Sequence, residues 1–249
     1  IRHYLTEQLV RRGNRVLFVE ANFTLTKFLR SWNWGRFVRF LSGAREKGKN
    51  LFLISAPPFF PGGEFFATIS RLNWAMTRMF LDKAIQTLEF KNPVLWIYAY
   101  NASSLVGEFN EQVALYLCND AFALLHHQPF LQQRVRSLEA KLLEKVDVTI
   151  SLSEKLTEAN RLFTRRAETI HHGVDVKHFD RVLSGSPKIP NDLVGIPRPI
   201  IGYSGVIRYM VDLDLIETIA RSRPEWSLVF VGPIDESAPS FYRRVEELK

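Results

Sequence analysis

Residues 199–233 carry the clearest pattern in the chain and read PIIGYSGVIRYMVDLDLIETIARSRPEWSLVFVGP. Residues 200–204 are a short apolar run typical of a buried strand, and a loop at Gly205 follows it. An apolar and acidic segment over 211–221 predicts a helix, and residues 227–231 predict a second strand. The stretch therefore predicts a βαβ unit, in which a helix joins two parallel strands.

Residues 184–199, which lead into this unit, hold four prolines and two glycines and are typical of a linker between domains. Before the linker, short apolar runs alternate with helical patterns, which predicts a parallel sheet covered by helices on both faces. The expected strands are 15–20, 50–55, 94–98, 113–118, 148–152 and 167–171, and the expected helices are 2–12, 65–88, 130–145 and 153–163. We therefore expect two α/β domains, residues 1–190 and residues 191–249.

The composition excludes several classes of protein. Of the 249 residues, 46% are hydrophobic and 24% charged, as in ordinary globular domains, and no run approaches the roughly 18 apolar residues of a membrane span. The single cysteine, Cys118, excludes an internal disulfide and a multi-cysteine metal site. The histidine pairs 126–127 and 171–172 do not have the spacing of metal ligands, so we expect no metal site. The motifs HExxH, P-loop, GxGxxG and GxSxG are absent, which disfavours metalloproteases, P-loop hydrolases, NAD dehydrogenases and serine hydrolases.

Positive charge is concentrated near the start of the chain. Residues 1–60 hold 11 Lys/Arg and 3 Asp/Glu, a net charge of +8, whereas the whole chain carries +7. Within residues 27–40, four cations alternate with five aromatic rings: Lys27, Arg30, Arg36 and Arg39 with Phe28, Trp32, Trp34, Phe37 and Phe40. This composition is typical of a segment that binds an anionic membrane surface, or of a surface segment whose rings pack inward. It also suits a nucleic-acid groove, but no nucleic-acid motif accompanies it, so we expect no nucleic-acid partner.

Four stretches of the sequence resemble the GT-B glycosyltransferases, in particular the family 4-type (glycosyl transferases group 1-like) enzymes. Residues 5–20 (LTEQLVRRGNRVLFVE) look like the first helix and second strand of their N-terminal domain. Residues 142–156 (LLEKVDVTISLSEKL) resemble the strand and serine-started helix near the end of that domain. Residues 169–179 (TIHHGVDVKHF) are similar to an Asn-Gly-Val-Asp…Phe segment, and residues 199–233 look like the opening of the donor-binding domain.

The resemblance implies an α/β, GT-B-like fold of two Rossmann-like domains with parallel sheets. It implies that the N-terminal domain takes the acceptor and that the C-terminal domain holds a nucleotide sugar. It also implies a retaining enzyme that uses no metal and no cofactor besides its nucleotide-sugar substrate. The chain begins at Ile1 and lacks the family's opening strand and most of its second domain. We therefore expect a fragment with a truncated second domain, which alone is inactive.

The resemblance also indicates site residues, although it assigns no catalytic residue. Gly205 and Arg208 are the expected donor-binding residues, because a glycine loop and an arginine suit a diphosphate. Asn119 and Asp120 follow a strand and are the expected acceptor-binding residues. The chain departs from the family in three places: Val206 and Val211 stand where relatives often carry an arginine and a lysine, and His172 replaces an asparagine.

Glu217 and Glu225 have the spacing of the family's acidic motif, but Glu217 is expected in mid-helix, so we interpret this match as accidental. The implied function is transfer of a sugar to a glycan or lipid-linked acceptor, in surface polysaccharide or glycolipid assembly. We expect a cytoplasmic protein that sits peripherally on the inner face of the cell membrane through residues 27–40. The missing diphosphate clamp leaves an alternative, a non-catalytic glycan-binding or scaffold protein that retains the GT-B fold.

Overall fold

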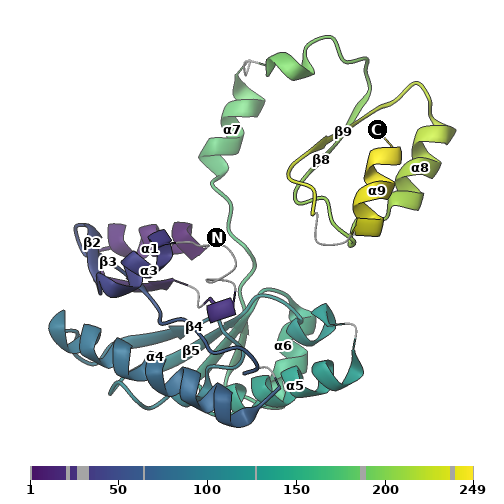
Figure 1. Cartoon of the computed structure of the whole chain (residues 1–249). Helices are drawn as coiled ribbons and strands as arrows, with labels where there is room; N and C mark the ends of the chain where they lie inside the picture. The colour runs from purple at the N-terminus through teal and green to yellow at the C-terminus, as the bar shows by residue number, and fades with distance from the viewer. Residues whose placement is uncertain are drawn as a thin grey trace. The chain divides into compact units, whose positions relative to one another are not determined.

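The computed structural model describes residues 2–20, 23–26, 34–63, 65–126, 128–185, 189–235 and 239–248. The chain forms two compact units, residues 1–173 and residues 174–249 (Figure 1). The segment 174–190, which the sequence analysis assigned to the first domain, groups with the second unit. Among the described residues, no helix is both long and apolar enough to cross a membrane.

The first unit begins with a small three-stranded sheet in the order β1-β3-β2. Its strands are β1 (Val16–Glu20), β2 (Arg45–Gly48) and β3 (Leu51–Ser55), and the helices near it are α1 (Arg2–Arg11) and α3 (Trp34–Leu41). β1 and β3 are parallel, as predicted, but β2 is antiparallel to β3 and was not predicted. The reason is that β2 reads REKG and lacks an apolar pattern. Charged residues are common on an edge strand, because they discourage further pairing.

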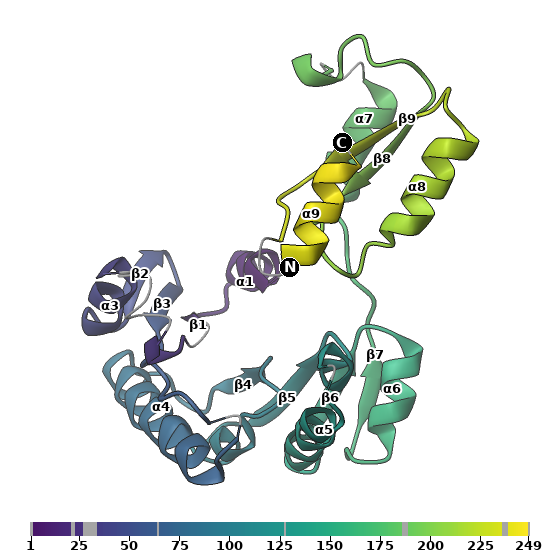
Figure 2. The same cartoon turned by 45° about the vertical axis from the view of Figure 1, so that its right-hand side comes forward.

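The second sheet of this unit is entirely parallel, in the order β4-β5-β6-β7. Its strands are β4 (Val94–Ile97), β5 (Val113–Cys118), β6 (Val148–Ser151) and β7 (Ala167–Thr169), with helices α4 (Ala67–Thr87), α5 (Pro129–Leu143) and α6 (Glu154–Arg161) and the short 3-10 helices η1 (Ser103–Leu105) and η2 (Phe122–Leu125). The predicted strands and helices are confirmed with small shifts at their ends. Figure 2 shows α4 and α5 on the same side of this sheet. Ser153 caps α6, as predicted: its hydroxyl accepts from the amide of Leu156 at 3.3 Å.

The core of the first unit lies between the strands and these helices. Tyr116 on β5 and Leu142 on α5 are fully buried, and Ile54 on β3 belongs to the same cluster. Phe59 and Trp74 meet edge to face with ring centroids 5.2 Å apart, which ties the segment after β3 to α4. The loops that follow β4 and β5 lie at the carboxyl edge of this sheet, where ligands of parallel sheets bind.

The second unit contains the predicted βαβ arrangement. Its elements are α7 (Val176–Ser184), η3 (Asn191–Leu193), β8 (Ile200–Ser204), α8 (Leu213–Ser222), β9 (Ser227–Val231) and α9 (Pro239–Glu247). β8 and β9 are parallel, with the bounds that the sequence predicted. α8 starts at Leu213 instead of residue 211 because Asp212 caps it: the Asp212 carboxylate accepts from the amide of Leu215 at 2.9 Å. The helix α7 was not predicted.

Candidate functional site

In the second unit, the segments that follow β8 and β9 approach each other closely, and we call this close approach the crossing. The amide of Gly205 donates to the carbonyl of Val231 at 3.0 Å, and the amide of Ile207 donates to the carbonyl of Pro233 at 2.9 Å. Gly232 has φ +151°, and a Cβ there would collide with the carbonyl oxygen of Gly205. Only glycine allows this close approach, so the glycine fixes the path of the loop at Gly205.

A cavity of about 800 Å³ lies in the first unit, and a second one of about 540 Å³ lies beside this loop in the second unit. We call the latter the loop cavity; it is lined by Tyr203, Val206, Arg208, Met210, Val211, Asp212, Leu215 and Ile216. Arg208, one of the two expected donor-binding residues, lines this cavity and has an exposed side chain. Gly205 shapes the loop but is not among the lining residues. Val206 and Val211, which stand where relatives often have cations, make the wall apolar.

The electrostatics of the loop cavity do not strongly favour a diphosphate. Its single cation, Arg208, faces the same space as the carboxylate of Asp212. A helix N-terminus attracts anions through its free amides. Here the Asp212 carboxylate already accepts from the amide of Leu215, and a second acid, Asp214, lies in the first turn. The helix end therefore offers fewer free donors than a start at residue 211 would have given.

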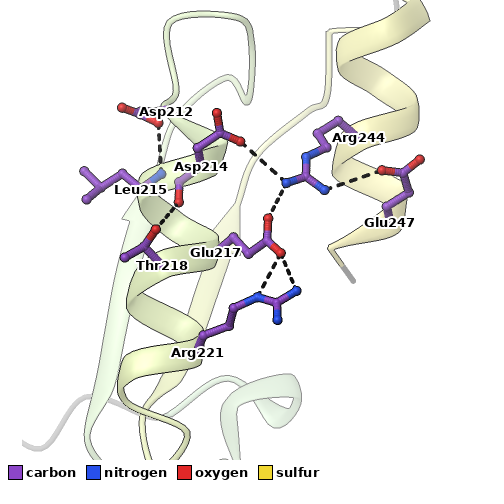
Figure 3. A network of polar contacts seen from close by, with 8 residues as sticks. All are labelled: Asp212, Asp214, Leu215, Glu217, Thr218, Arg221, Arg244 and Glu247. Atoms are coloured by element: carbon purple, nitrogen blue, oxygen red, sulfur yellow. Dashed lines mark hydrogen bonds and ion pairs between the residues drawn. The ribbon is translucent and has the colours of Figure 1, made fainter.

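The other charged groups of α8 form a network with α9 (Figure 3). Arg244 on α9 forms ion pairs with Glu217 and, at 3.5 Å, with Asp214. Arg221 donates to Glu217 as well, at 2.7 and 2.9 Å. Hydrogen bonds from Arg221 and then Arg244 lower the pKa of Glu217. Glu217 is therefore engaged in joining two helices, which supports the interpretation of the Glu217 and Glu225 spacing as accidental.

In the first unit, Asn119 and Asp120 follow β5 at the carboxyl edge of the parallel sheet, and both are exposed. The Asp120 carboxylate accepts from the amide of Ala121 at 2.9 Å, which is a local turn contact. Its second oxygen has no hydrogen bond to the part of the chain that the structure describes, so it can accept from a sugar hydroxyl. The acceptor-binding role of both residues stays a prediction, as does the donor-binding role of Gly205 and Arg208.

A buried polar cluster lies directly behind that edge. Glu139 on α5 accepts from the Tyr116 hydroxyl at 2.7 Å and from the Cys118 thiol at 3.6 Å. Burial raises the pKa of Glu139, although these two hydrogen bonds oppose the shift. Burial, followed by the charge of Glu139, raises the pKa of Cys118 to about 11. The thiol therefore stays protonated at neutral pH, which makes it a poor nucleophile.

The larger cavity is a feature that the sequence analysis missed. We call it the helix groove, and it lies between α4, η1 and α5. Its polar and aromatic lining residues are Phe65, Ser70, Arg71, Trp74, Asn101, Ser103, Ser104, Phe130, Gln133, Arg134, Ser137, Lys141, Glu144 and Lys145. These positions come from three separate segments, so no local motif marks them. The only signal in the sequence is the spacing of Phe130, Arg134, Ser137 and Lys141, which repeats every three or four residues along one helix face.

Most of the segment 27–40 lies outside the described residues, which omit positions 27–33 and the side chains of Trp34, Arg36 and Phe37. The described remainder belongs to α3. Arg39 forms an ion pair with Glu20 at 3.9 Å, and Phe40 packs on Phe80 with ring centroids 5.1 Å apart. The proposed membrane contact therefore stays a prediction.

No known protein-family profile matches the chain. A curated Bacillus subtilis (strain 168) protein, "Putative teichuronic acid biosynthesis glycosyltransferase TuaH", is 26% identical over 110 residues. That alignment covers 42% of this chain and 27% of the Bacillus protein, so the chain spans about a quarter of the length of this relative.

Solved structures of two α,α-trehalose-phosphate synthases resemble the chain over most of its length. The enzyme from Burkholderia vietnamiensis, named as UDP-forming, matches with a TM-score of 0.51 and 13% identity, covering 83% of this chain and 59% of that one. The enzyme from Burkholderia multivorans matches with a TM-score of 0.54 and 13% identity, covering 94% of this chain and 68% of that one. At this identity the likeness concerns the fold: the chain has the α/β fold, with parallel sheets, of GT-B glycosyltransferases.

Proposed function

We propose that the chain is part of a glycosyltransferase that moves a sugar from a nucleotide-sugar donor to a glycan or lipid-linked acceptor. The observation that carries the proposal is the match of both α/β units, in one chain, to structures of glycosyltransferases. The curated relative, whose name assigns it to teichuronic acid biosynthesis, supports a role in surface polysaccharide or glycolipid assembly. Retention of configuration and independence of metal ions and cofactors are parts of the same proposal and rest on the family resemblance.

In this proposal, the loop cavity takes the diphosphate of the donor. Charge grows on the phosphate oxygens as the sugar leaves, and Arg208 is placed to neutralise part of it with two parallel N–H donors. The apolar wall of Val206 and Met210 then faces the less polar part of the donor. On the acceptor side, the free oxygen of Asp120 and the amide of Asn119 hydrogen-bond hydroxyl groups at the carboxyl edge of the sheet.

The proposal is tested by incubating the complete gene product with a panel of nucleotide sugars and measuring sugar transfer or donor hydrolysis. We expect turnover of at least one donor. Arg208→Ala should reduce kcat/KM about tenfold or more, the usual cost of one charge-assisted contact in a transition state. Arg223→Ala is the matched control, because Arg223 is exposed and lies over Trp226, away from the loop cavity. Equal losses in both variants would contradict the role of Arg208.

A second function is favoured by the single positive charge in the lining of the loop cavity. A non-catalytic glycan-binding or scaffold protein with this fold needs no diphosphate clamp, and the valines at positions 206 and 211 with Asp212 suit that case. Binding of glycans without measurable affinity for any nucleotide sugar would establish it. Peripheral attachment to the inner face of the cell membrane through residues 27–40 is a separate proposal. It predicts co-sedimentation with anionic but not with neutral vesicles.

A further inference from the structure

Positively charged side chains outnumber negatively charged ones in the lining of the helix groove. Arg71, Arg134, Lys141 and Lys145 line it against a single carboxylate, that of Glu144. Arg71, Arg134 and Lys141 form no ion pair with any residue that the structure describes. Arg78, one turn further along α4 than Trp74, behaves differently, because it pairs with Glu108 at 2.6 Å. Three cations without a carboxylate partner among the described residues therefore line the same cavity.

Arg134 adds a second observation to this excess of cations. Its Nε atom is buried and has no hydrogen-bond partner among the described residues. Three other described side chains, Arg39, Arg45 and Trp96, have such an atom, but none of them lines the helix groove. A buried donor without an acceptor is unfavourable, and rotation of the Arg134 side chain towards an oxyanion in the groove would remove the penalty. Arg134 also lines a small cavity next to the groove, together with Asn101 and His126.

Neutral donors surround these cations. The hydroxyl groups of Ser70, Ser104 and Ser137 and the amide of Asn101 belong to the same lining. Lys145 donates to the carbonyl of Ser103 at 3.0 Å, which holds η1 against the end of α5. A guanidinium fork together with hydroxyl groups is the donor set that tetrahedral phosphate oxygens require.

The groove has an aromatic end as well. Phe65 and Phe130 lie with ring centroids 6.5 Å apart, and they are 55% and 57% exposed. Rings of this kind offer a face to an apolar chain or to the C–H side of a sugar. A ligand that fills the groove therefore carries a negative group and a less polar part next to it.

We propose that the helix groove binds a phosphate-bearing ligand, with the phosphate between Arg71, Arg134 and Lys141 and the less polar part on Phe65 and Phe130. The phosphate belongs either to a soluble sugar phosphate or to a lipid headgroup. The proposal does not depend on sugar transfer, because the groove lies within the first unit and needs no donor.

The test measures binding by the whole chain to four probes: inorganic phosphate, a hexose phosphate, vesicles of anionic phospholipid, and neutral phosphatidylcholine vesicles as the reference. For at least one phosphate probe, Arg134→Ala should raise the Kd about tenfold, since one charge-assisted fork is lost. Arg136→Ala is the matched control: Arg136 lies on the same helix, is exposed, and does not line the groove. Lys141→Glu, at an exposed position, gives a second variant whose folding is not in question.

The outcomes separate the two sources of phosphate. Binding of the hexose phosphate, lost in Arg134→Ala and Lys141→Glu, indicates a soluble ligand. If the parent binds only the anionic vesicles, and the two variants lose this binding, the ligand is a lipid headgroup. The proposal is overturned if no phosphate probe binds, or if Arg134→Ala and Lys141→Glu bind as tightly as Arg136→Ala does. Nucleotide-sugar turnover is scored separately, so its absence leaves this result intact.

Discussion

The helix groove of the first unit and the loop cavity of the second unit are built on opposite electrostatic principles. The groove gathers four cations around one carboxylate, whereas the cavity offers one arginine against the carboxylate of a helix cap. The groove is shaped by side chains of two helices, and the cavity by a backbone crossing at Gly232. Of the two cavities, the helix groove has the larger excess of positive over negative side chains. If the second unit binds a diphosphate, as proposed, backbone geometry has to supply much of the affinity, because the loop cavity has a single cation.

The largest expected effect tests that dependence on geometry. Gly232→Ala places a Cβ against the carbonyl of Gly205 and demands a positive φ from alanine. We expect a loss of about 3 kcal/mol in the stability of the β8–β9 region. Hydrogen exchange of the β8 and β9 amides measures it. Gly202→Ala is the control, because nothing lies within 4 Å of its added Cβ. If the β8 and β9 amides exchange at the same rate in both variants, the close approach at Gly232 does not stabilise the loop at Gly205.

A second prediction concerns the buried carboxyl behind the acceptor edge. Burial raises the pKa of Glu139 above its usual value of 4.5. A carboxyl group whose pKa is raised by folding binds its proton more tightly in the folded state. Its contribution to the free energy of unfolding is therefore present below the unfolded-state pKa and is lost as the pH rises through the folded-state pKa. Glu139→Gln keeps an oxygen for the Tyr116 hydroxyl and cannot ionise. It should therefore be more stable than the parent by about 1 kcal/mol at pH 8, with the gap closing towards pH 5.

Hydrogen exchange of the β5 and α5 amides between pH 5 and 8 follows this difference. Tyr116→Phe should have the opposite effect on stability. It removes the hydrogen bond that lowers the pKa of Glu139, so the pKa of Glu139 should rise further. That variant should lose stability more steeply than the parent as the pH rises. The prediction would be contradicted if the difference in amide protection between Glu139→Gln and the parent were the same at every pH.

Some features of the fold could be predicted from the sequence and others could not. β5, β8 and β9 have the predicted bounds, because continuous apolar runs are typical of strands in parallel sheets. β2 was missed because its four residues are polar, and α8 was predicted two residues early because the capping role of Asp212 was not recognised.

The candidate site was harder to predict than the strands. Arg208 was selected because its loop directly follows a predicted strand, and the structure shows that it lines the loop cavity. The helix groove depends on how α4 and α5 pack, which no single segment shows. The sequence does contain a signal for Glu139: it lies four residues after Val135 and three before Leu142, and both of these are buried apolar residues of the same helix.

A third prediction alters the balance of charge in the loop cavity. Asp212→Asn keeps a side-chain oxygen for the amide of Leu215 and removes one negative charge from the lining. Binding of a nucleoside diphosphate such as UDP should tighten about threefold, in line with the small energy of one charge near a helix end. Titration calorimetry measures the Kd. The Asp192→Asn variant, at an exposed residue outside the cavity, should leave the Kd unchanged. Unchanged binding in Asp212→Asn would mean that the diphosphate does not approach this helix end.

The smallest expected effect concerns the ion pairs between α8 and α9. Hydrogen bonds from Arg221 and Arg244 lower the pKa of Glu217 below its usual 4.5, so the sign is opposite to that of Glu139. This stabilisation is present above the usual value and lost as the pH falls through the lowered value. Glu217→Gln should therefore flatten the loss of α9 amide protection below about pH 4.5 while changing little at pH 7, because surface ion pairs contribute little. Lowering the pH should loosen α8 and α9 of the parent protein, while protonation of Glu139 removes the cost of burying its charge in the first unit. If α9 protection in the parent does not fall with acid, the network does not join the two helices in solution.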